Sequence, residues 1–269
     1  MHSRNIQGCC HFLLFVEIFF LRFFLYIQIN LKKKMNIKKY LFWMSIYMMM
    51  SMMKEKRAYI FDLDNTLIET KARAYLYSPE GKMEGRYTTA EVRDHKKWIN
   101  EKLSEGYKMN FDEIGDNSDK SLYYLMEGIK LQHFDYFEEK MRENPKDVYI
   151  LTGRGNHPEV IETFFKMKWD IQIPQSHIFT VAHPETFQNT KEEVEREFNT
   201  HPIWSSFLVK DSPLASTHKK KRLILFHILS KGYDTVEFYD DDMDNIREAQ
   251  EFMKDVEKYN FGQMEIYHV

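Results

Sequence analysis

The chain has 269 residues, of which 43% are hydrophobic and 29% charged, and its formal net charge is −3. With 10 Gly, 7 Pro and 2 Cys it is not a collagen, a disordered chain or a disulfide-stabilised scaffold. The average charge conceals two unlike segments, because residues 1–56 carry nine Lys or Arg and only two acidic residues. Residues 57–269 are acidic, so we treat a basic leader and an acidic body as separate parts.

The leader contains an apolar stretch, residues 11–29, which favours membrane insertion by about 4 to 8 kcal/mol. Glu17 and Arg22 lie near its middle and oppose insertion by about 5 to 7 kcal/mol together, so a membrane span is marginal. A second apolar stretch, residues 40–53, is too short to cross a bilayer and lacks a small-residue cleavage site. Three interpretations follow: an over-extended reading frame with a cytoplasmic start near Met53, a membrane anchor through residues 11–29, or a signal sequence.

The body begins with an apolar segment, residues 58–61, that reads as a buried strand. It runs into a polar loop with the sequence Asp62-Leu63-Asp64-Asn65-Thr66-Leu67. A hairpin is expected over residues 73–88, because two aromatic-rich segments flank a Ser-Pro-Glu-Gly turn. Helices are expected over residues 89–103, 119–130 and 134–143.

The rest of the body alternates strands and helices. Strands are expected at 148–151, 178–181, 236–239 and 264–269, and helices from Pro158, from Thr217 to before Gly232, and over 245–258. This alternation predicts an α/β fold, a Rossmann-like parallel sheet with helices on both faces. Residues 68–147 form a cap-like insertion in that pattern, and residues 170–216 form a second, looser one.

Charge and cysteine content exclude two classes of function for the body. Its negative charge provides no surface for duplex nucleic acid, which requires clustered Lys and Arg on one face. Both cysteines, Cys9 and Cys10, lie in the leader, so the body has no cysteine nucleophile and no disulfide.

Polar side chains follow three of the predicted strands where those strands end. Asp62 and Asp64 follow the first strand, Thr152 follows the second, and Asp240 and Asp241 follow a later one. Open parallel sheets bind ligands at the carboxyl ends of their strands, so these side chains are expected to converge in one site.

This order and spacing resemble those of the haloacid dehalogenase-like phosphohydrolases, over residues 58–269. The family signature is an Asp-x-Asp-x-Thr loop, a Thr or Ser after the second strand, a later Lys and a final acidic pair. The resemblance implies that Asp62 is a nucleophile forming an aspartyl-phosphate and that Asp64 is the general acid and base. It also implies that the phosphate is contacted by Thr152, Gly153, Thr66 and Arg154. The same resemblance implies that Mg²⁺ is bound by Asp62, the main-chain carbonyl of Asp64, and Asp240, with Asp241 or Asp244 close by.

The lysine that would bind the phosphate is ambiguous, because Lys219, Lys220 and Lys221 are consecutive. Lys220 matches the family spacing better, whereas Lys221 shares a helical stripe with Ile224 and Ile228. Both Lys220 and Lys221 are therefore kept as candidates.

Two further features have competing interpretations. Arg154 either contacts substrate or forms a surface ion pair. Asp240, Asp242 and Asp244 have the spacing of a calcium loop, but Asn245 stands at the position that requires Gly, so we set that interpretation aside.

The resemblance implies that the insertion at 68–147 is a cap that selects substrate. Lys210 and several aromatic residues of the second insertion, 170–216, are further candidate substrate contacts. The expected function is Mg²⁺-dependent hydrolysis of a small phosphorylated substrate. The segment from Tyr239 to Asn245 resembles small phage-encoded members of the family, which suggests a nucleotide or a nucleic-acid end. The alternatives are a polynucleotide 3′-phosphatase or phosphotransferase of the same fold, and a catalytically silent, membrane-anchored binding module.

Overall fold

The computed structural model describes residues 55–207 and 217–269, with Met44 alone ahead of them. The chain divides into two compact units, residues 1–54 and 55–269, and the account below concerns the second. The expectations for the leader and for Lys210 therefore lie outside the described residues. In the part of the chain that is described, no helix is both long and apolar enough to span a membrane.

The centre of the fold is a five-stranded sheet in which every pairing is parallel, which confirms the predicted α/β class. The strand order is β10-β9-β1-β7-β8, so β1 lies in the middle. Ile60 of β1 pairs with Tyr149 of β7 on one side and with Phe238 of β9 on the other. The strands are β1 (Arg57–Phe61), β7 (Val148–Thr152), β8 (Ile178–Thr180), β9 (Thr235–Asp240) and β10 (Gln263–His268).

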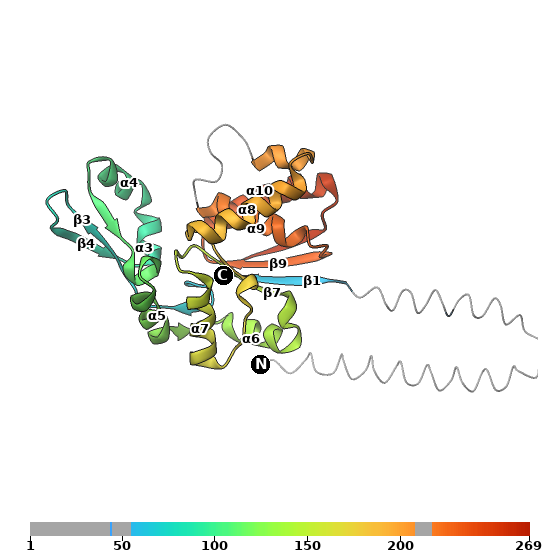
Figure 1. The fold of residues 1–269 in the computed structure, drawn as a ribbon, viewed down its shortest axis with the longest axis horizontal. Coiled ribbons are helices and arrows are strands. Elements are labelled where there is room, and N and C mark those ends of the chain that lie inside the picture. Colours follow the sequence, from blue (N-terminus) through green and yellow to red (C-terminus); the bar gives the residue numbers. More distant parts are fainter. Residues whose placement is uncertain (1–43, 45–54, 208–216) are drawn as a thin grey trace, which may run out of the picture. The chain divides into compact units, whose positions relative to one another are not determined.

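Helices cover both faces of this sheet (Figure 1). One face, which includes Ala58 and Ile60, packs against α8 (Pro184–Phe198), α9 (Thr217–Leu229) and α10 (Met243–Tyr259). The other, which includes Phe61 and Ile150, packs against α5 (Ser118–Glu127), α6 (Phe134–Glu143) and α7 (Pro158–Trp169). Successive side chains of a strand point to opposite faces, so apolar residues throughout the central strands feed two cores.

Only the first part of the predicted cap insertion, 68–147, forms a separate small sheet, because α5 and α6 in its second part pack against the central sheet. The predicted hairpin is present as β3 (Ala74–Tyr77) and β4 (Met83–Tyr87), and β5 (Lys108–Asn110) joins β3 on its other edge. The expected helix over 89–103 is divided at His95 into α3 (Thr89–Asp94) and α4 (Lys96–Ser104). Figure 1 shows these elements projecting away from the central sheet.

The cap returns to the core through a short π-helix, η1 (Asp112–Asp116), which leads into α5. A two-stranded pairing of β2 (Ile68–Glu69) with β6 (Ile129–Lys130) closes the insertion. Gly115 lies so close to the core that an added Cβ would be 2.5 Å from the amide nitrogen of Gly155. A glycine is therefore required there for the two backbones to approach.

The expectation of a loose insertion over 170–216 was wrong for its middle part. Residues 184–198 form α8, in which Phe187, Thr190 and Val194 are buried on one stripe against the sheet. His183 caps the helix start and Pro184 occupies its first turn. These signals were present in the sequence, but the many charged residues on the exposed face obscured the narrow apolar stripe. Three short 3₁₀ turns complete the elements, at Pro145–Asp147, Gln175–His177 and Pro202–Phe207.

A buried histidine in α9 should make stability depend on pH. His227 is 6% exposed and packs against Phe179. Burial, together with the charge of Lys231, lowers the pKa of His227 from 6.5 to about 4. As pH falls through this interval the unfolded chain binds a proton that the folded chain does not, so the free energy of unfolding decreases.

We expect this histidine to remove up to about 3 kcal/mol of stability between pH 7 and pH 4. Urea unfolding of the wild type and of His227→Leu at both pH values measures the effect. The variant should lose less stability than the wild type on acidification, and equal losses would contradict the assignment.

Candidate functional site

The polar clusters predicted at three strand ends do meet. Asp62 follows β1, Thr152 ends β7 and Asp240 ends β9, and these three strands are adjacent in the sheet. The Asp62 amide donates to the carbonyl of Tyr239 at 2.9 Å, which fixes the first loop against the end of β9. The site therefore lies at the carboxyl edge of the central strands, where parallel sheets expose unpaired backbone groups and loop side chains.

One lysine joins two of these carboxylates. The Lys221 ammonium group donates to Oδ1 of Asp62 at 2.6 Å and to Oδ2 of Asp240 at 2.7 Å. All three side chains are buried, and Lys221 is 3% exposed. Burial alone would lower the pKa of Lys221, but the charges of Asp240 and Asp62 raise it above its ordinary value. The ammonium group therefore remains protonated in the site.

The structure separates the lysines that the sequence left ambiguous. Lys220, one position earlier, points elsewhere: its ammonium group donates to the carbonyl of Val181 at 3.2 Å and lies over the ring of Phe187. Adjacent helical residues are about 100° apart around the axis, so only one of the two can reach the acidic cluster. That residue is Lys221, on the stripe of buried apolar residues of α9.

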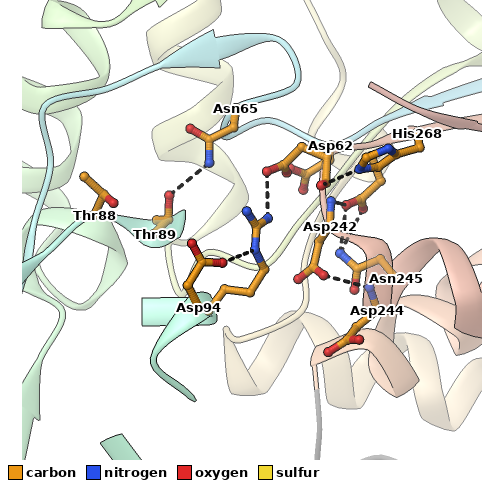
Figure 2. Close-up of polar contacts among 12 residues, drawn as sticks. Asp62, Asn65, Thr88, Thr89, Asp94, Asp242, Asp244, Asn245 and His268 are labelled. Atoms are coloured by element: carbon orange, nitrogen blue, oxygen red, sulfur yellow. Dashed lines mark hydrogen bonds and ion pairs between the residues drawn. The ribbon is translucent and has the colours of Figure 1, made fainter. Parts of the chain in front are cut away.

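Asp240 is held by further donors in addition to Lys221. Its Oδ1 accepts from the Asp242 amide at 2.9 Å and from the Asn245 side chain at 2.9 Å. Asp242 in turn caps α10 by accepting from the amide of Asp244 at 2.8 Å. Figure 2 shows Asp62, Asp242 and Asn245 gathered at this loop, with His268 of the last strand beside them.

The carboxylates of Asp62, Asp240 and Asp241 form the cluster best suited to a metal ion among the described residues, with ligand atoms within 4.8 Å of one another. They offer only oxygen, the donor that Mg²⁺ prefers. Burial raises the pKa of Asp62 well above its ordinary value, against the lowering effect of Lys221. Burial also raises the pKa of Asp241. Three carboxylates against the Lys221 ammonium group and the Arg93 guanidinium beside Asp241 leave a net negative charge, which a cation would offset.

The carboxylate of Asp64 is not part of that cluster. Instead, Arg154 donates to both of its oxygens, from Nη2 to Oδ1 at 2.6 Å and from Nε to Oδ2 at 2.7 Å. The main-chain carbonyl of Asp64 remains a predicted metal ligand.

One of the two expectations for Arg154 needs correction, the surface ion pair. The side chain is 1% exposed, so its ion pair is not at the surface. Its guanidinium donates to Asp64, to the carbonyl of Ile114 at 2.8 Å and to the hydroxyl of Ser121 at 3.1 Å. These acceptors fix the planar guanidinium in one orientation. Arg154 also lines the cleft, so its contact with substrate stays a prediction.

The other predicted contacts divide into two groups. Thr152 and Gly153 line the cleft above the acidic cluster, and the Thr152 hydroxyl accepts from the Arg154 amide at 3.3 Å. Thr66 is buried outside the lining of the cleft, and its hydroxyl has no hydrogen-bond partner among the described residues. The structure therefore does not bring Thr66 to the site.

A cleft of about 400 Å³ lies between the strand ends and the cap. The core contributes Asp62, Asp64, Thr152, Gly153, Arg154, Lys221, Asp241, Asp242, Asp244 and Asn245, among others. The cap contributes Thr89, Val92, Arg93, Lys96, Phe111 and Ile114. In Figure 2 the cap residues Thr88, Thr89 and Asp94 lie across from Asp62 and Asp242 of the core.

Two contacts cross this cleft and were missed in the sequence. Arg93 of α3 donates to Oδ2 of Asp241 at 2.8 Å. The Asn65 side chain donates to the Thr89 hydroxyl at 3.4 Å, drawn in Figure 2. Arg93 and Asp241 are 148 positions apart, so only the expectation that a cap covers the site could have suggested a link.

The comparisons with protein families, curated proteins and solved structures found no match to this chain.

Proposed function

We propose that the protein is a Mg²⁺-dependent phosphomonoester hydrolase that acts through Asp62. The observation that carries this proposal is the buried arrangement of Asp62 and Asp240 around the Lys221 ammonium group, with Asp241 beside them. A carboxylate can attack an anionic phosphate only where positive charge offsets the repulsion. The resemblance of the sequence to the haloacid dehalogenase-like phosphohydrolases supports the same function.

In the proposed first step, a carboxylate oxygen of Asp62 attacks phosphorus while the bond from phosphorus to the leaving oxygen breaks. Asp64 enters this step protonated, with one oxygen released from Arg154, and donates that proton to the leaving oxygen. In the second step Asp64 takes a proton from water, and the oxygen of that water attacks phosphorus. The bond from phosphorus to the Asp62 oxygen breaks, which releases inorganic phosphate and restores the Asp62 carboxylate. Thr152 and the Gly153 amide line the cleft where the phosphoryl oxygens would lie.

Asp62, Asp240 and Asp241 are the side chains that would hold the cation. When bound there, Mg²⁺ would neutralise negative charge on the phosphoryl oxygens. Lys221 supplies a fixed positive charge to the same region and keeps the two carboxylates it bridges in place.

The test is release of inorganic phosphate by the full chain from a panel of phosphomonoesters, with Mg²⁺ and with EDTA. We expect turnover with Mg²⁺, its loss in EDTA and its recovery on adding excess Mg²⁺. Absence of turnover across the panel, with Mg²⁺ binding retained in calorimetry, would favour a silent binding module. Alcohol acceptors and 3′-phosphorylated oligonucleotides in the same panel distinguish a phosphotransferase and a polynucleotide 3′-phosphatase.

The Arg154 ion pair leads to a prediction about Asp64. Arg154→Lys keeps the charge but cannot hold both Asp64 oxygens, and it leaves the Ile114 carbonyl or the Ser121 hydroxyl without its donor. We expect kcat to fall about 100-fold with little change in KM, because a misplaced general acid affects the chemical step more than binding.

Steady-state kinetics at a temperature where circular dichroism shows the variant folded measures this effect, together with the pH profile of kcat. The exposed Arg142→Lys is the matched control, and it should behave as the wild type. An Arg154→Lys enzyme with kcat within twofold of the wild type and an unchanged pH profile would contradict the role.

A further inference from the structure

The cleft extends beyond the groups that would transfer phosphate. On the cap side it is lined by Thr89, Val92 and Arg93 of α3, Lys96 of α4, and Phe111 at the start of η1. In Figure 2 the α3 residues Thr89 and Asp94 face the loop that carries Asp242 across the opening. A phosphomonoester whose phosphate lies at Asp62 would therefore place its leaving group against this part of the cap.

The cap residues that line the cleft, here called the cap wall, first provide an aromatic surface that is held in place. Phe111 packs against a small cap cluster that contains Ala72, Ala74 and Ile114, so part of its ring is buried while the side chain lines the cleft. Val92 packs on the same cluster and also lines the cleft. A ring held in place by its own core offers a stacking or edge contact to a flat ligand ring at little cost in side-chain entropy.

The second property is its charge. Within the described part of the cleft, the two cations nearest the strand ends are already paired, Arg154 with Asp64 and Lys221 with Asp62 and Asp240. On the cap side, Arg93 is paired with Asp241 at 2.8 Å and with Asp94 at 3.5 Å, and Lys96 is exposed at the cleft, which Asp116 also lines.

The opposite lip of the cleft is acidic. Asp242 and Asp244 line it from the start of α10. A second negative group on a substrate is therefore repelled by this lip and attracted toward Lys96, since the charge of Arg93 is already balanced by Asp241 and Asp94. Charge complementarity thus directs the leaving group to the same wall that carries Phe111.

We propose that Val92, Arg93, Lys96 and Phe111 form a leaving-group subsite for phosphomonoesters that carry a flat aromatic ring and a second anionic group, such as a nucleoside bisphosphate. The inference rests on the proposed hydrolase function. A cleft of about 400 Å³ is within the ordinary range for sites that bind ligands of this size.

The test compares four esters that differ in ring and second charge: fructose 6-phosphate, fructose 1,6-bisphosphate, adenosine 5′-monophosphate and adenosine 3′,5′-bisphosphate. For the wild type we expect the highest kcat/KM with the last. Lys96→Gln should lower kcat/KM about tenfold for the bisphosphates alone, and Phe111→Leu about tenfold for the adenosine esters alone. Lys97→Gln, an exposed neighbour outside the lining of the cleft, is the control and should change neither.

The same four ligands are titrated calorimetrically into the full-length Asp62→Asn variant, with and without Lys96→Gln or Phe111→Leu. If binding depends on Lys96 and Phe111 but the wild type shows no turnover, the result supports the proposed subsite and contradicts the hydrolase function. If the wild type turns over all four esters with equal kcat/KM, or if Lys96→Gln and Lys97→Gln have equal effects, the result contradicts the proposed subsite but leaves the hydrolase function supported.

Discussion

Replacing Asp62 by asparagine is expected to lower Mg²⁺-dependent phosphate release by at least about 1,000-fold, because the amide cannot form the acyl-phosphate that the proposed mechanism requires. The fold should survive the change. Asparagine has the same shape, and Lys221 retains its ion pair with Asp240 at 2.7 Å. The defect should therefore appear in kcat rather than in the unfolding transition.

The measurement is kcat on the best ester of the panel, with thermal unfolding followed by circular dichroism. Rapid acid quenching adds a direct readout, since the wild type should yield a hydroxylamine-labile phosphoenzyme and the variant none. Asp135→Asn, an exposed change in the first turn of α6, is the matched control. Undiminished hydrolysis by Asp62→Asn would refute the mechanism even if the protein proves to be a phosphatase.

The second large effect is expected at Lys221. Lys221→Met keeps much of the side-chain volume but removes the positive charge between Asp62 and Asp240, leaving two buried carboxylates without their common partner. Removing one member of a buried ion pair destabilises a protein by about 3–5 kcal/mol. Activity should also be lost, because the phosphate would meet uncompensated negative charge.

The adjacent residue provides the control for this variant. Lys220 is partly exposed, donates to a backbone carbonyl and makes no ion pair among the described residues, so Lys220→Met should change stability by no more than about 1 kcal/mol. Urea unfolding at pH 7 compares the two variants. A Lys221→Met protein as stable as Lys220→Met would contradict the buried triad.

The pH dependence of the Lys221→Met defect gives an independent check. Burial already raises the pKa of Asp62, and removing the ammonium group removes the charge that lowers it, so Asp62 holds its proton to higher pH in the folded state than in the unfolded state. Stability then rises as pH falls and is lost as pH rises through the raised pKa of Asp62. The deficit relative to the wild type should therefore shrink on acidification from pH 7 toward pH 4.

The strand ends were predictable because their signal is local. Short apolar segments that stop at Asp62, Thr152 and Asp240 indicate buried parallel strands, and the carboxyl edge of such a sheet collects whatever follows them. The hairpin of the cap was equally visible, since its turn residues lie within a few positions of both strands.

Other parts of the site depend on distances that no local pattern encodes. Whether Lys220 or Lys221 enters the site depends on the rotation of α9 about its axis, which packing against the sheet sets. The partner of Asp64 is Arg154, 90 positions away, and Arg154 also donates to the carbonyl of Ile114 in η1 and to the hydroxyl of Ser121 in α5. The π-helix at Asp112–Asp116 was likewise not expected, because its sequence is polar and short.

The sequence by itself thus determined the α/β class, the succession of the main strands along the chain and the set of carboxylates at their ends. Hydrophobic periodicity and turn residues act over a few positions, and such local patterns are sufficient to predict these features. Only the tertiary structure decided which lysine bridges Asp62 and Asp240, and that Arg154 is buried against Asp64. It also decided that Arg93 reaches Asp241 across the cleft. These pairs form because the packing of helices and cap against the sheet brings distant charges within hydrogen-bonding distance. A charge removed from water is costly unless it is paired, so burial favours these ion pairs.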